Sequence, residues 1–264
     1  MRGLAGFHGM RLYSGTSGFS YQEWHGAFYP EDLPAADRLA YYAARLPAVE
    51  INQTFYRMPR ASLLAGWAAQ VPDAFRFAVK ASRKITHLKR LADVGEETQY
   101  LIETARALGE KLGPLLFQLP PNLKLDLERL DRFLDHLPPG TLAALEARHA
   151  SWRDDAVLAR LRQRGLAWVI TENDEEARAE ILATAPWLYL RLRRTDYDRA
   201  ALAGWATQLR AAAPVQAFAF FKHEDGALGT KWAMELLAHA QRGGERRAPV
   251  RGARGRAKRA GGEA

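Results

Sequence analysis

The seven residues Trp187-Leu188-Tyr189-Leu190-Arg191-Leu192-Arg193 alternate leucine with side chains of other kinds. Side chains of an extended strand point alternately to its two faces, so the leucines share one face and the two arginines share the other. In a barrel enclosed by helices, the apolar face contacts the helices and the other face points to the barrel axis. The pattern therefore predicts a barrel strand that carries Arg191 and Arg193 inside, near its carboxyl end.

Short apolar runs of strand length recur along the rest of the chain. They cover residues 11–15, 48–52, 75–80, 115–119, 142–147, 166–171 and 217–221. Segments with helical periodicity, such as 96–112 and 230–240, separate them. This alternation predicts parallel strands and a single-domain α/β fold, a TIM-like (β/α)8 barrel. The alternative is a doubly wound open sheet, but the glycines at 15 and 18 lead into an aromatic loop rather than a dinucleotide-binding helix.

The net charge of +8 is concentrated at one end of the chain. Residues 242–264 hold eight basic and two acidic residues, which leaves only +2 for residues 1–241. We expect a loose extension over 1–10, the barrel over 11–241 and a disordered basic tail over 242–264. The tail either solubilises the protein or touches nucleic acid through its charge.

Composition removes several functional classes. The chain has no cysteine, which excludes disulfides, thiolate metal sites and cysteine nucleophiles. It contains neither a long apolar run nor a secretory leader, so we expect a cytoplasmic protein without a membrane partner. No motif for an organic cofactor is present, and the oligomeric state stays open.

Strand parity places polar side chains inside the barrel at the carboxyl ends of five strands. These residues are Glu50, Asn52, Lys80, Gln118, Glu146, Arg148, Arg191 and Arg193. Catalytic groups of such barrels lie at this end. The four cations outnumber the two carboxylates, which favours an anionic ligand. The alternative is an internal layer of salt bridges, with Glu50 and Glu146 paired to Lys80 and Arg148.

The last strand leads into a second candidate for anion binding. Lys222 and His223 follow it, and Gly226 and Gly229 precede a helix whose amino terminus would favour negative charge. We expect these residues and Arg191 to form one anion site. Substituting Arg191 by alanine should then weaken anion binding and leave stability almost unchanged.

Two early loops are rich in aromatic residues. They contain Phe19, Tyr21, Trp24, His25, Phe28 and Tyr29 after the first strand, and Phe55 and Tyr56 after the second. These rings either stack on a base or sugar at the mouth, with Tyr56 as a substrate contact, or form a small packed lid.

Several motifs carry a resemblance to a known family. They include Gly15-Thr16-Ser17-Gly18, Val49-Glu50-Ile51-Asn52, Thr54-Phe55-Tyr56-Arg57, Phe77-Ala78-Val79-Lys80, Phe117-Gln118-Leu119-Pro120-Pro121, Glu146-Ala147-Arg148-His149 and Phe220-Phe221-Lys222-His223-Glu224. Over residues 11–240 the chain resembles the domain of unknown function 72 (DUF72) family, the YecE-like proteins. The resemblance implies a TIM-like barrel and no assigned activity. Ala147 and Ala150 depart from its usual aromatic and proline residues without removing a charge.

We expect an enzyme acting on a small anionic substrate, such as a sugar phosphate, a nucleotide or a polyol carboxylate. Glu50 and Glu146 would exchange protons, and Lys80 would tune them or form a Schiff base. Isomerase, lyase and hydrolase chemistry all stay open. A metal-dependent isomerase using Glu50, Glu146, His149 and Glu172 is disfavoured by the positive surplus, and a glycosidase pair needs a carboxylate spacing unknown from sequence. The alternative of another class is a nucleic-acid or nucleotide binding protein.

Overall fold

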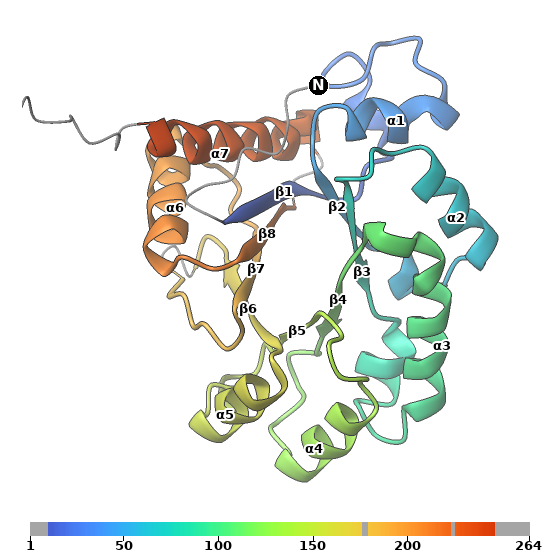
Figure 1. Ribbon diagram of the computed structural model, residues 1–264, viewed down its shortest axis with the longest axis vertical. Coiled ribbons are helices and arrows are strands. Elements are labelled where there is room, and N and C mark those ends of the chain that lie inside the picture. Colours follow the sequence, from blue (N-terminus) through green and yellow to red (C-terminus); the bar gives the residue numbers. More distant parts are fainter. Residues whose placement is uncertain (1–9, 176–178, 223–224, 246–264) are drawn as a thin grey trace, which may run out of the picture.

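The computed structural model describes residues 10–175, 179–222 and 225–245. Eight parallel strands pair in chain order, and β8 pairs with β1 to close a barrel (Figure 1). The strands are β1 Arg11–Ser17, β2 Ala48–Ile51, β3 Arg76–Lys80, β4 Leu112–Gln118, β5 Ala143–Glu146, β6 Ala167–Glu172, β7 Trp187–Leu192 and β8 Gln216–Phe221. The predicted single-domain TIM-like (β/α)8 barrel is confirmed.

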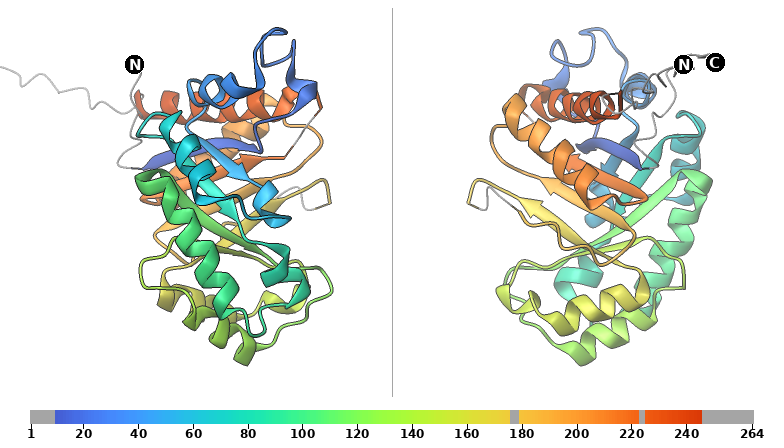
Figure 2. Two further views of the ribbon diagram at one scale, coloured as in Figure 1. Left: turned by 90° about the vertical axis from the view of Figure 1, so that its right-hand side faces the viewer. Right: turned by 60° about the vertical axis from the view of Figure 1, so that its left-hand side comes forward.

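Helices surround the barrel, as Figures 1 and 2 show. They are α1 Arg38–Ala43, α2 Ala61–Ala69, α3 Gly95–Ala105, α4 Leu127–Asp135, α5 Asp155–Arg164, α6 Arg199–Ala212 and α7 Leu228–Glu245. The connection between β6 and β7 departs from the regular alternation, because its described residues form no helix. Helix α7 packs against α6 and β1 (Figure 2).

The described structure continues slightly past both expected ends of the barrel. Met10 is buried, although it was assigned to the loose extension, and α7 continues to Glu245, beyond the expected boundary at 241. Residues 1–9 and 246–264, which hold most of the extension and the tail, lie outside the described residues. Within the described residues, no helix combines the length and the apolar character needed to cross a membrane.

Local signals in the sequence fix several element boundaries. The Asp154 carboxylate accepts a hydrogen bond from the backbone N–H of Ala156 at 2.8 Å and begins α5, and Gly165 ends that helix with a φ of 66°. Gly15 permits the close approach of β1 and β2, because a Cβ atom there would lie 1.8 Å from the carbonyl oxygen of Ala48.

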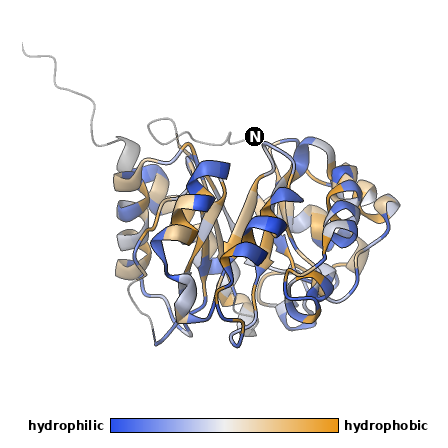
Figure 3. Ribbon diagram, turned by 90° about the horizontal axis from the view of Figure 1, so that it is seen from below, coloured by the Kyte–Doolittle hydropathy of each residue, from blue (hydrophilic) through white to orange (hydrophobic). Residues whose placement is uncertain are grey.

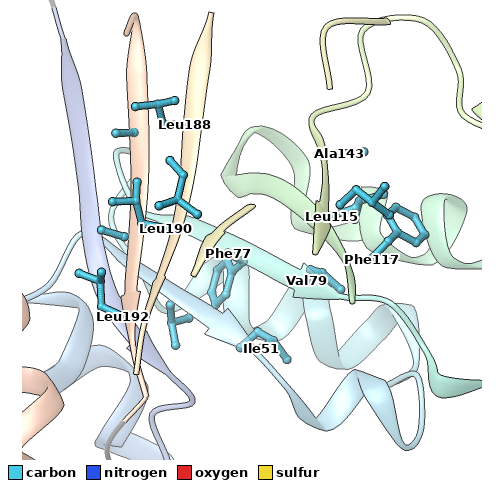
Figure 4. Close-up of a cluster of buried hydrophobic side chains, with 14 of the residues drawn as sticks. Ile51, Phe77, Val79, Leu115, Phe117, Ala143, Leu188, Leu190 and Leu192 are labelled. Atoms are coloured by element: carbon cyan, nitrogen blue, oxygen red, sulfur yellow. The ribbon is translucent and has the colours of Figure 1, made fainter. Parts of the chain in front are cut away.

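The strands separate two hydrophobic cores. The outer core lies between barrel and helices and contains Val49 and Ile51 of β2 together with the three leucines of β7 (Figure 4). The inner core fills the barrel with residues that include Tyr13, Leu116, Tyr189, Phe218 and Phe220. Figure 3 shows mainly hydrophobic residues along the central strands, whereas hydrophilic and hydrophobic residues alternate along the helices. The three leucines of β7 lie in the outer core and Tyr189 lies in the inner core, which confirms the predicted parity of this strand.

Candidate functional site

The Glu50 carboxylate lies inside the barrel above the inner core and is fully buried. Its Oε1 accepts hydrogen bonds from Ser17 Oγ at 2.8 Å and Arg191 Nη2 at 2.8 Å. Its Oε2 accepts from Tyr189 Oη at 2.7 Å and Arg191 Nε at 3.0 Å. Four charge-assisted hydrogen bonds therefore leave this carboxylate little capacity for a further partner.

The Glu146 carboxylate is also buried and shares Arg191 with Glu50. Arg191 Nη1 donates to its Oε2 at 2.7 Å, and Gln118 Nε2 donates to its Oε1 at 2.8 Å. Two further guanidinium groups lie farther from Oε1, with Arg148 Nε at 3.5 Å and Arg193 Nη1 at 3.8 Å. Among the described residues, only Arg191 thus forms a close ion pair with Glu146, and the other two arginines keep donors for another partner.

Burial and charge act in opposite directions on these groups. Burial by itself would raise the pKa of Glu50, but the charge of Arg191 and the hydrogen bonds from Arg191, Tyr189 and Ser17 lower it further than burial raises it. For Glu146, burial is likewise outweighed by Arg191, Arg193 and Arg148, and the pKa falls to about 2. Both carboxylates are therefore ionised at neutral pH.

Lys80 lies at the carboxyl end of β3 and is 9% exposed. Among the described residues, no carboxylate comes within 4.0 Å of its Nζ, which instead lies 4.2 Å from the centre of the Phe55 ring. Burial and then the charge of Arg191 lower the pKa of Lys80 to about 8, against the opposing charges of Glu50 and Glu146. The amine thus exists in both protonation states near neutral pH.

Two residues that the sequence placed inside the barrel each have a buried polar atom without a hydrogen-bond partner among the described residues. They are Nε of Arg193 and Oδ1 of Asn52, one donor and one acceptor. Burial and then the charge of Arg191 lower the pKa of Arg193. Buried polar groups are normally satisfied by protein, water or ligand, and these two atoms have no protein partner among the described residues.

His87 extends the site on the side of Phe55. It lies in a π-helical turn, Lys84–Leu88, which interrupts ordinary helical geometry directly after β3. The imidazole meets the Phe55 ring edge-on at 4.9 Å, and its Nδ1 lies 2.9 Å from Thr86 Oγ1. Burial, followed by the charges of Lys80 and Arg148, lowers the pKa of His87, which favours a neutral ring beside the lysine.

The sequence pattern of the family described as "Protein of unknown function DUF72" matches residues 13–254. The chain belongs to the DUF72 family. The match extends past Gln241, where we expected the resemblance to end.

Known proteins agree with this assignment. The chain is 30% identical over 138 residues to the UPF0759 protein YecE of Escherichia coli K12, covering 50% of this chain and 51% of the relative. It is 26% identical over 149 residues to the UPF0759 protein YunF of Bacillus subtilis, covering 53% and 52%. The matched region thus spans about half the length of each of these curated relatives.

Two solved DUF72 structures show the same fold. A family member from Thermotoga maritima superposes with a TM-score of 0.73 at 24% identity, covering 88% of this chain and 98% of that one. A second, from Enterococcus faecalis, superposes with a TM-score of 0.73 at 19% identity, covering 88% and 95%.

In this DUF72 protein the described contacts of Arg191 are with two glutamates, whereas the sequence analysis expected it to bind an anionic ligand. Nε, Nη1 and Nη2 all donate to the two carboxylates, so the guanidinium belongs to an internal salt-bridge layer and has all three nitrogens engaged within the protein. That layer was the alternative interpretation, but its partners differ from those expected. Arg191 replaces Lys80 as the principal cation, and Arg148 contributes only a longer contact.

The described residues of the turn after β8 make no hydrogen bond or ion pair to this network. Lys222 is exposed and its backbone N–H donates to the carbonyl of Leu192 at 3.0 Å. Gly226 is exposed with a φ of 56°, and Gly229 is buried. His223 lies outside the described residues. Because Arg191 is committed to the carboxylates, the expected shared anion site of Arg191 and this turn is not supported.

The aromatic loop after β1 is packed. Trp24 and Tyr29 are buried, and Trp24 meets Phe28 edge-on at 5.7 Å. This favours the packed-lid interpretation for the first loop. Tyr56 in the second loop is 72% exposed and stays available for a ligand.

Glu172 was one of four residues considered for a metal. It points out of the barrel, where Trp205 Nε1 of α6 donates to its Oε2 at 2.9 Å. His149 Nδ1 lies 2.9 Å from Ser151 Oγ in the loop after β5. Glu172 therefore does not converge with Glu50 and Glu146 on one centre.

Proposed function

We propose that this protein is an enzyme that binds a small anionic substrate at the carboxyl end of the barrel and transfers a proton through Lys80. The observation that carries this proposal is the state of Lys80. It is a nearly buried amine with no carboxylate within 4.0 Å among the described residues and a pKa of about 8. Catalytic acids and bases work best when their pKa lies near the working pH.

The surrounding charges support an anionic substrate. Lys80, Arg148 and Arg193 adjoin the network, while the negative charges of Glu50 and Glu146 are met mainly by Arg191. Arg148 and Arg193 keep partly exposed side chains, at 36% and 20%. Guanidinium groups bind carboxylate and phosphate through paired hydrogen bonds. The buried Oδ1 of Asn52 adds an acceptor for a substrate hydroxyl.

The same contacts change the roles that the sequence suggested for the glutamates. A carboxylate with a pKa of about 2 is a weak base, and Glu50 has both oxygens occupied. We assign Glu50 and Glu146 to positioning Arg191 and to setting the electrostatic field at Lys80. The neutral amine can then accept a proton from carbon next to a carbonyl, as isomerases and lyases require, or attack the carbonyl itself.

Competitive acetylation tests this proposal. The protein is treated with trace acetic anhydride across pH 6–11, and the labelling of each lysine is quantified by mass spectrometry. Lys80 should label with a midpoint at about 8. Lys84 is the matched control, because its hydrogen bond to Glu97 raises its pKa. Inorganic phosphate or sulfate should protect Lys80 and leave Lys84 unchanged. The proposal is contradicted if the midpoint for Lys80 lies above 10, or if neither phosphate nor sulfate reduces the labelling of Lys80.

A further inference from the structure

A cavity of about 370 Å³ lies beside the mouth of the barrel and is lined by the loops that follow β2 and β3 and by helix α3. Its lining includes Tyr56, Met58, Ser82, Lys84, Tyr100 and Leu101. Sites for small molecules usually measure about 300 to 1,000 Å³ and combine apolar walls with a few polar groups. The cavity, here called the rim pocket, has that size and that kind of lining.

Two tyrosines of the rim pocket are unusually exposed. Tyr56 is 72% exposed and Tyr100 is 58% exposed, and they are two of only five large apolar or aromatic side chains exposed among the described residues. Aromatic rings are normally packed or, when exposed beside a cavity, available to stack on a ligand. The buried Leu101 and the partly buried Met58 add apolar surface to the same cavity.

The polar side of the rim pocket is held in place. Glu97 forms ion pairs with Lys84 at 2.8 Å and Lys89 at 2.9 Å, and hydrogen bonds from these two lysines lower its pKa to about 2. Lys84 and Ser82 thus offer donors at a fixed edge of the cavity, and Glu96 offers an acceptor. The heterocyclic rings of nucleobases present both donors and acceptors in one plane.

A chain of ring contacts connects the rim pocket to Lys80. Lys80 Nζ lies 4.2 Å from the centre of the Phe55 ring, and that ring meets Tyr56 edge-on with 5.1 Å between centroids. Tyr56 in turn lines the cavity. The mouth and the rim pocket are therefore neighbours, separated by a single aromatic side chain.

We propose that the rim pocket binds a planar heteroaromatic ring of the same ligand whose anionic group binds at the mouth. This inference rests on the proposed function for the anionic half and specifies the substrate class as nucleotide-like. A nucleotide joins such a ring to a phosphate through one sugar, which suits two neighbouring subsites of this chemistry. Tyr100 and Tyr56 stack on the ring, and Lys80 with Arg148 and Arg193 faces the phosphate.

Isothermal titration calorimetry with three probes tests the inference. The probes are inorganic phosphate, adenosine and adenosine monophosphate, each titrated into wild type, Tyr100→Ala, Val215→Ala and Lys80→Met. Tyr100→Ala removes an exposed ring without disturbing the core, and Val215→Ala removes an equally exposed side chain before β8, at the opposite end of the barrel.

Wild type should bind adenosine monophosphate more tightly than either phosphate or adenosine. Removing one aromatic side chain on which a base stacks lowers the affinity by about 5- to 140-fold. Tyr100→Ala should show this loss for the two adenine probes and none for phosphate, whereas Val215→Ala should match wild type. Lys80→Met should weaken phosphate and adenosine monophosphate only.

The outcomes separate this inference from the proposed function. If Tyr100→Ala binds both adenine probes as wild type does, the rim pocket does not hold the ring, even when phosphate binding depends on Lys80. If adenosine affinity falls in Tyr100→Ala while neither wild type nor any variant binds phosphate, the rim pocket is confirmed as the ring site. The proposed anion site at the mouth is then wrong.

Discussion

Arg191 on β7 donates two hydrogen bonds to Glu50 on β2, at 3.0 and 2.8 Å, across the inside of the barrel. The two strands are not neighbours, since β8 and β1 separate them. Through its third nitrogen, Arg191 also reaches Glu146 on β5. One guanidinium thus joins three distant strands, and burial makes the arrangement favourable only while every partner is present.

Removing Arg191 should therefore destabilise the protein strongly. Deleting one partner of a buried ion pair typically lowers the free energy of unfolding by about 3–5 kcal/mol, and here two carboxylates would lose their cation. Urea denaturation of Arg191→Ala at pH 7 measures the loss. Arg164→Ala is the control, because Arg164 pairs with Asp135 at the surface and should contribute about 0–1 kcal/mol. Equal losses for the two variants would show that the buried network is not what stabilises the barrel.

The same variant should reverse the acid dependence of stability. In wild type, the pKa of Glu146 is about 2 in the folded state and near 4.5 in the unfolded chain. The ionised carboxylate therefore adds to the free energy of unfolding above pH 4.5, and this contribution is lost as the pH falls toward 2. Without Arg191, burial of Glu50 loses the principal cation that opposes it, so its pKa should rise above that of the unfolded chain, while Arg193 and Arg148 still oppose burial at Glu146. The folded state then binds a proton at Glu50 that the unfolded state does not. Arg191→Ala should gain stability between pH 7 and 5, measured by thermal unfolding, where wild type stays level or loses stability.

Tyr189→Phe isolates one hydrogen bond to Glu50. A hydrogen bond to a charged group contributes about 1.5–3 kcal/mol, and Tyr189 Oη donates to Glu50 at 2.7 Å. Tyr13→Phe makes the same chemical change in the inner core, at a hydroxyl for which no hydrogen bond is found among the described residues. Chemical denaturation should show the loss for Tyr189→Phe alone. A loss of similar size for Tyr13→Phe would assign the effect to the core rather than to Glu50.

Lys80→Met should change the alkaline dependence of stability. Burial lowers the pKa of Lys80 to about 8 from its ordinary 10.5, so between these values the unfolded chain holds a proton that the folded chain has released. This group therefore makes wild type more stable as pH rises from 8 to 10.5. The free energy of unfolding of Lys80→Met relative to wild type should be highest below pH 8 and should fall by roughly 1–3 kcal/mol toward pH 10.5. A difference that does not vary with pH would contradict the lowered pKa.

Glu146→Gln should lower the pKa of Lys80 further. The negative charge of Glu146 opposes the effect of burial on that pKa, and the amide removes it. Competitive acetylation should then show a midpoint for Lys80 below 8. Glu172→Gln is the control, because this carboxylate bonds Trp205 outside the barrel and should leave the midpoint unchanged.

Strand parity predicted much of the candidate site. The leucines of β7 and the valine and isoleucine of β2 belong to the outer core, so the polar residues between them had to point inward. The same argument covers Ser17 and Tyr189, which share the inward face with known core residues and bond Glu50. Their hydroxyls were overlooked because a serine or tyrosine carries no charge to signal a buried partner.

The role of Arg191 could not be obtained from parity. Counting charges gave a positive surplus, but a count does not say which cation lies closest to which carboxylate. Arg191, two residues before Arg193, hydrogen-bonds both carboxylates, whereas Arg193 lies 3.8 Å from Glu146. His87 was missed for another reason. Its position beside Phe55 depends on a π-helical turn, and no residue pattern in the sequence predicts that geometry.

The link from β2 through β7 to β5 also constrains how the barrel can be assembled. A fragment ending after β4 would carry Glu50 without Arg191, and the complementary fragment would carry Arg191 and Glu146 without Glu50. Each half would have to leave its charges in water or neutralise them. The candidate site therefore comes into existence only when the last strands close against the first, so nascent chains and autonomous half-barrels of this protein would be without it.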